Sequence, residues 1–99
     1  MNLGSIASRL RAGETVTFVA QGGSMAGRVE SGSTVTVYPV PGDERLEKGD
    51  VVLARVNGRW LLHLISGFGS DGRRVQISNN HGRVNGWTAR SNVVGKIAC

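Results

Sequence analysis

Two residues far apart in the chain have side chains that could together hydrolyse a peptide bond. Ser24 follows two glycines, and His63 interrupts an otherwise apolar run over residues 60–65. A serine hydroxyl becomes a good nucleophile when a neighbouring base takes its proton, and histidine is the most common such base. The pair therefore predicts nucleophilic catalysis, with Ser24 as the nucleophile and His63 as the base.

The elements that must position this pair are predicted to be mostly β-strands. Leu3, Ile6, Ala7 and Leu10 follow helical spacing, which predicts one short N-terminal helix over about residues 2–12, before Gly13. Beyond it, β-branched and alternating stretches predict strands over about 15–20, 34–38, 50–56, 59–65, 73–78 and 92–98. Residues 79–91 are expected to be irregular. The expected fold class is mainly β, mostly antiparallel, with a β core over about 14–98.

The Asn57-Gly58 pair sets the register around His63. It is the dipeptide that most favours a two-residue type I′ hairpin turn. Such a turn places Val56 opposite Arg59 and, counting back, His63 opposite Val52. Because the strand over 59–65 carries apolar residues on both faces, we expect it to be central in the sheet, where it would hold His63 firmly.

Size and composition predict one soluble domain over residues 1–99. A chain of 99 residues can close one hydrophobic core but hardly a second. Its apolar runs are too short to cross a bilayer, and its first residues lack the apolar core of a signal peptide. We therefore expect a cytoplasmic protein that does not bind membranes. Its one cysteine, Cys99, cannot form an internal disulfide, and without a zinc-spaced Cys/His cluster we expect no metal or other cofactor.

The net charge of +5 is unevenly distributed along the chain. Residues 1–71 include seven acidic and seven basic residues, whereas the residues after Asp71 include five basic residues and no acidic one. A basic C-terminal half can attract nucleic acid or an acidic partner through long-range electrostatics. The simpler alternative is that these basic residues are solvated on the surface and bind no partner. The sequence is also compatible with a homodimer.

Several short motifs occur in the order found in one known family. Gly-Ser-Met at 23–25 precedes Gly-Ser-Thr-Val-Thr-Val at 32–37, Gly-Asp-Val-Val-Leu-Ala-Arg at 49–55, Leu-His at 62–63 and Val-Gly-Lys-Ile at 94–97. Together they resemble the catalytic domain shared by LexA-type self-cleaving repressors and type I signal peptidases. The match covers about residues 14–98. The resemblance implies a soluble serine endopeptidase that hydrolyses a peptide bond in a protein or peptide substrate, which docks as an additional strand.

The resemblance also implies roles for individual residues. The serine of the Ser-Met box is the nucleophile in that family, which is Ser24 here. The base, a lysine in LexA-like members and a histidine in another branch, lies at the eighth position after the Ala-Arg arginine. That position is His63, counted from Arg55. Backbone N–H groups around Ser24 would hold the oxyanion, with Gly22 and Gly23 allowing close approach. Met25 would pack beside the nucleophile.

The chain differs from the family pattern at the residues that could orient the base. A Gly-Asp-Asn box, whose aspartate could orient the base, is replaced here by Ser78-Asn79-Asn80. Asn79, Asn80 and His81 are therefore the candidate orienting residues, although all three also suit an ordinary polar turn. Without the carboxylate the charged imidazolium loses stabilisation. The alternative function is a catalytically degenerate module that keeps the peptidase fold and binds a protein or nucleic acid.

Overall fold

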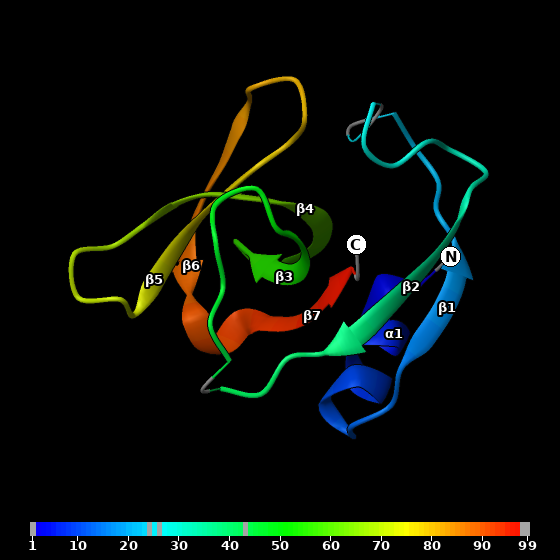
Figure 1. The fold of residues 1–99 in the computed structure, drawn as a ribbon, viewed down its shortest axis with the longest axis horizontal. Helices are drawn as coiled ribbons and strands as arrows, with labels where there is room; N and C mark the ends of the chain where they lie inside the picture. The colour runs from blue at the N-terminus through cyan, green and yellow to red at the C-terminus, as the bar shows by residue number, and fades with distance from the viewer. Residues whose placement is uncertain (1, 24, 26, 43, 98–99) are drawn as a thin grey trace.

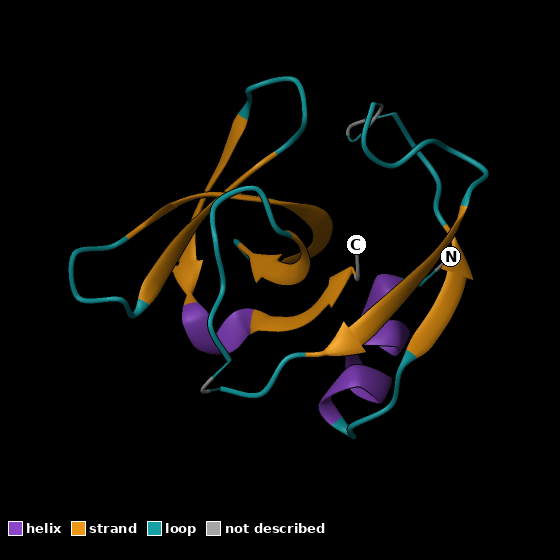
Figure 2. Ribbon diagram, viewed as in Figure 1, coloured by secondary structure: helices purple, strands orange, loops and turns teal. Residues whose placement is uncertain are grey.

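The computed structural model describes residues 2–23, 25, 27–42 and 44–97. Within them, one antiparallel sheet has the strand order β1-β2-β7-β3-β4-β5-β6, and a short helix lies at the N-terminus (Figures 1 and 2). The elements are α1 (Leu3–Arg11), β1 (Val16–Val19), β2 (Thr34–Pro39), β3 (Val51–Val56), β4 (Arg59–Phe68), β5 (Arg74–Ser78), β6 (Val84–Ala89), the 3₁₀ turn η1 (Arg90–Asn92) and β7 (Val93–Ile97). The predicted fold class, mainly β with one short N-terminal helix, is confirmed.

Helix α1 forms where helical spacing predicts it. The side chain of Asn2 caps it by accepting a hydrogen bond from the backbone N–H of Ser5 at 3.1 Å. Its buried face packs on the sheet in an apolar cluster, which we call core 1: Ile6, Ala7, Leu10, Val16, Val37, Leu53, Leu62 and Val94. The helix thereby covers one face of the sheet, including the face of β4 from which Leu62 projects.

The β3–β4 hairpin has the predicted turn and register. Asn57 and Gly58 both have positive φ, 50° and 79°, as a type I′ turn requires. Val56 pairs with Arg59, and Val52 pairs with His63. Strand β4 lies between β3 and β5 and continues to Phe68, beyond its predicted end. The base candidate therefore sits on an internal strand.

The expectation that residues 79–91 are irregular is wrong, because they contain strand β6 and the turn η1. Strand β6 pairs with β5 and folds over β3, where the Thr88 hydroxyl donates to the Arg55 carbonyl at 2.6 Å. Asn85 and Gly86 are poor strand formers and, as a pair, typical of turns, so local sequence hides a strand that tertiary contacts hold. A second apolar cluster, which we call core 2, is formed by residues of β3, β4, β5 and β7 and the loop before β3: Leu46, Val52, Ala54, Val56, Ile65, Val75, Ile77 and Val93.

No helix in the described ranges is both long enough and apolar enough to cross a membrane.

The close packing of α1 on the sheet depends on Gly95 in β7. A Cβ atom at this position would lie 2.5 Å from Val37 Cγ1 and 2.7 Å from Leu10 Cδ1, well inside van der Waals contact. We expect Gly95→Ala to lower the free energy of unfolding by about 1–3 kcal/mol, the usual cost of overpacking a core. Urea unfolding measures it. Gly42→Ala is the control, because a Cβ there meets open space. Equal stability of the two variants would contradict this packing.

Candidate active site

His63 is held in a defined orientation by a hydrogen bond within the sheet. The side chain is buried, with 8% of its surface exposed, and its Nδ1 lies 2.7 Å from Oδ1 of Asn85. An amide oxygen can only accept a hydrogen bond, so Nδ1 carries the proton that is donated to it. In the neutral ring the unprotonated nitrogen is then Nε2. This is the tautomer that a general base needs if it acts through Nε2.

Asn85 is a site residue that the sequence analysis missed. It lies on β6, in the segment expected to be irregular, and reaches His63 because β6 crosses close to the β3–β4 hairpin. Gly86 permits that approach. Its φ is 147°, and a Cβ there would lie 3.3 Å from Val56 Cγ1 and 3.4 Å from Asn57 Nδ2. The neighbouring Trp87, a good strand former, was the available signal for β6.

The segment around Ser24 is anchored on both sides, although Ser24 itself lies outside the described residues. Before it, Gly22 has a φ of 96°, and its N–H donates to the Ser31 hydroxyl at 3.3 Å. After it, Met25 is buried, and its carbonyl accepts from the N–H of Val29 at 2.7 Å. Met25 belongs to a third apolar cluster with Ala20 and Val29.

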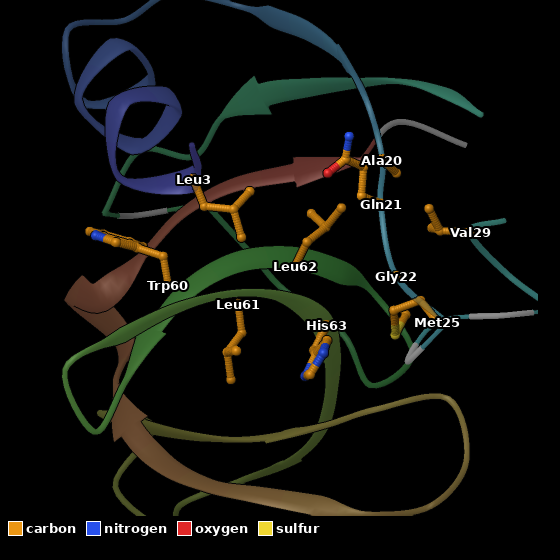
Figure 3. Close-up of a pocket in the computed structure, with 10 residues that line it drawn as sticks. All are labelled: Leu3, Ala20, Gln21, Gly22, Met25, Val29, Trp60, Leu61, Leu62 and His63. Atoms are coloured by element: carbon orange, nitrogen blue, oxygen red, sulfur yellow. The ribbon is translucent and has the colours of Figure 1, made fainter. Parts of the chain in front are cut away.

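Gly22, Met25 and His63 line one pocket of about 170 Å³ (Figure 3). In the close-up, Leu61 and His63 project from one face of β4 and Leu62 from the other. The remaining lining residues are mostly apolar: Leu3, Ala20, Gln21, Val29, Trp60, Leu61 and Leu62. Gly22 and Met25, which flank Ser24 in sequence, therefore share a pocket with the base candidate.

The three predicted orienting residues lie in the β5–β6 loop. Asn79 Oδ1 accepts from the N–H groups of His81 and Arg83, both at 2.9 Å, and so shapes the loop itself. His81 Nε2 lies 2.9 Å from the Gly23 carbonyl, to which it donates. The Asn80 amide faces Gly27, since a Cβ there would lie 3.1 Å from Asn80 Nδ2.

The β5–β6 hairpin therefore contacts both halves of the candidate site. Its tip bonds to the segment before Ser24 through His81, and its second strand bonds to His63 through Asn85. The hydrogen bond that fixes the His63 tautomer comes from Asn85 rather than from one of the three residues expected from sequence. For metals, the residues described contain no group of three or more His, Cys, Asp or Glu that could hold an ion.

The two histidines of the chain should adopt opposite neutral tautomers. His63 is expected to carry its proton on Nδ1, facing Asn85, and His81 on Nε2, facing the Gly23 carbonyl. Long-range ¹H–¹⁵N correlation NMR of the neutral rings distinguishes the two forms. Asn85→Ala should abolish the Nδ1 preference of His63 and leave His81 unchanged. An Nε2-protonated His63 in the unmodified protein would contradict the geometry.

A scan against models of known protein families and a search of curated proteins found no match to this chain. The resemblance to LexA-type repressors and type I signal peptidases therefore stays a prediction from sequence motifs.

Proposed function

We propose that this protein is a serine peptidase that hydrolyses a peptide bond with Ser24 as nucleophile, His63 as general base and Asn85 as the residue that orients the base. The observation that carries the proposal is the 2.7 Å hydrogen bond that fixes His63 beside a pocket shared with Gly22 and Met25. The motif order that resembles the LexA and signal peptidase family supports the same chemistry.

In the proposed mechanism, Ser24 Oγ attacks the carbonyl carbon of the scissile bond while His63 Nε2 takes the hydroxyl proton. The tetrahedral intermediate collapses when the imidazolium returns that proton to the leaving amine. A water molecule, deprotonated by the same ring, then hydrolyses the acyl-enzyme. Backbone N–H groups near Ser24 would hold the oxyanion. Asn85 keeps the Nδ1 proton in place throughout, but its dipole stabilises the imidazolium less than a carboxylate would.

Strand β4 has a backbone edge suited to an extended substrate. Leu61 and His63 of β4 exchange backbone hydrogen bonds with β3. The N–H and C=O groups of the alternate residues, Trp60 and Leu62, therefore point away from β3, toward the other edge of β4. Strand β5 pairs with β4 only from Leu64 onward. A peptide could therefore add beside residues 60–62 as a short strand.

The segment before Ser24 has a second such edge across the pocket. The Ala20 N–H donates to the Ser33 carbonyl at 2.9 Å, and the Ala20 carbonyl accepts from Gly32 at 2.8 Å. The backbone N–H and C=O of Gln21, the next residue, therefore point away from residues 32–33. Gln21 also lines the pocket. Two backbone edges and an apolar pocket of about 170 Å³ suit an extended peptide that inserts one small apolar side chain.

Covalent labelling tests the nucleophile. We expect a fluorophosphonate probe to label the protein, Ser24→Ala to abolish labelling, and His63→Ala to slow it by a factor of about a hundred or more, the usual contribution of a general base. Ser70→Ala is the control, since this serine is exposed and does not line the pocket. A folded protein that the probe does not label would favour the degenerate binding module instead.

Two substitutions at Asn85 separate orientation from simple packing. Asn85→Ala should slow fluorophosphonate labelling by about tenfold to a hundredfold, because the ring loses the acceptor that fixes its tautomer. Asn85→Asp should label at least as fast as the unmodified protein, since a carboxylate accepts the same proton and also stabilises the imidazolium. Thermal melts of both variants control for folding. Equal slowing by the two substitutions would show that Asn85 does not act through His63.

A further inference from the structure

A second cleft, of about 490 Å³, also reaches His63, and the proposed mechanism does not use it. Its chemistry differs from that of the apolar pocket, because most of its lining side chains are polar or basic. The lining residues are Val56, Asn57, Arg59, Leu61, His63, Asn79, Arg83, Val84 and Asn85. We call this the basic cleft.

The basic cleft carries two arginines, and the described residues that line it include no acidic side chain. These arginines, Arg59 and Arg83, are both exposed. The ion pairs formed within the described ranges join other residues, Arg9 with Glu14 and Lys96 with Asp50. The cleft also presents the amides of three asparagines. It therefore offers guanidinium and amide donors to a ligand that carries acceptors and negative charge.

The position and length of the basic cleft follow from which residues of β4 line it. Arg59, Leu61 and His63 alternate along one face of this strand, so the cleft starts at the base candidate and extends toward the hairpin turn. At about 3.3 Å per residue, Arg59 lies about 13 Å along the strand from His63. Arg83 lines the same cleft just before β6 begins. An extended peptide whose scissile bond is at His63 would reach both guanidinium groups within about four residues.

We propose that the basic cleft binds an acidic segment of the substrate, with Asp or Glu side chains within about four residues of the scissile bond. This inference rests on the proposed function for the position of that bond, but the binding itself needs no catalysis. Arginine binds carboxylates through paired hydrogen bonds, and acidic substrates are also drawn to the cleft from a distance. A peptide fits better than nucleic acid, because the lining contains no Phe, Tyr or Trp on which successive bases could stack, and its one aromatic ring, His63, is buried.

Binding of short peptides to the Ser24→Ala protein tests the proposal without cleavage. Fluorescein-labelled Ala-Val-Ala-Glu-Asp-Glu is compared with its amide counterpart, Ala-Val-Ala-Gln-Asn-Gln, by fluorescence anisotropy at low salt. We expect the acidic peptide to bind about tenfold more tightly, as two charge-assisted contacts at an exposed site would give. The double variant Arg59→Gln/Arg83→Gln should reduce its affinity to that of the amide peptide. Arg45→Gln, which removes an exposed arginine outside the cleft, should change the affinity less than twofold.

Charge reversal gives a second readout that does not depend on loss of function. Arg59→Glu/Arg83→Glu should bind Ala-Val-Ala-Lys-Lys-Lys more tightly than the acidic peptide. Equal binding of the acidic and amide peptides, or an equal loss from Arg45→Gln, would overturn the proposal. So would tighter, cleft-dependent binding of a labelled oligothymidylate.

The two proposals can fail separately. Arginine-dependent binding of the acidic peptide by a protein that fluorophosphonate does not label would refute the peptidase and keep the cleft assignment for a bound peptide. Labelling at Ser24 without any preference for acidic peptides would refute the cleft assignment alone.

Discussion

The hydrogen bond between His63 Nδ1 and Asn85 Oδ1 is the interaction on which the candidate site depends. At 2.7 Å, on a ring that is 8% exposed, it fixes both the tautomer and the plane of the imidazole. A ring with its proton on Nε2 instead of Nδ1 could not accept a proton from a nucleophile at Nε2. A neutral amide in this place orients the base but gives it little electrostatic help. In the proposed peptidase, Asn85 would therefore stabilise the charged His63 ring less than an aspartate at the same position would.

The β5–β6 hairpin couples the parts of the site to one another. It supplies Asn85 to the base, His81 to the backbone before Ser24, and Arg83 to the basic cleft. Because one hairpin carries these contacts, a displacement of β6 would disturb the base, the serine segment and the proposed substrate cleft together. Gly86 is the residue that lets β6 lie close enough to β3 for this arrangement.

Local sequence signals predicted the parts of the fold that local interactions determine. The N-terminal helix, the Asn57-Gly58 turn and the pairing of His63 with Val52 follow from spacing and turn chemistry, and the structure confirms them. Strand β6 was missed because Asn85-Gly86 resembles a turn and because the contacts that hold β6 over β3 are distant in sequence. Missing β6 also hid Asn85, since a residue expected in an irregular loop has no register from which to place its side chain beside His63.

The sequence predicted the strand that carries His63 but not the residue whose side chain bonds to His63. In the family that the motifs resemble, an aspartate could orient the base, so the residues in and beside its place here, Asn79, Asn80 and His81, were the predicted candidates. In the structure, the side chain that bonds to His63 belongs instead to Asn85 on the following strand, and motif spacing could not predict this contact. Only the three-dimensional crossing of β6 over the β3–β4 hairpin brings that amide to the imidazole.

The most direct measurement is a crystal structure of the protein after reaction with diisopropyl fluorophosphate. The account predicts phosphorus bonded to Ser24 Oγ, His63 Nε2 within hydrogen-bond distance of the adduct, and Nδ1 still bonded to Asn85. An adduct on another residue, or a His63 ring that faces away from Ser24, would contradict the assignment of these residues as a catalytic pair.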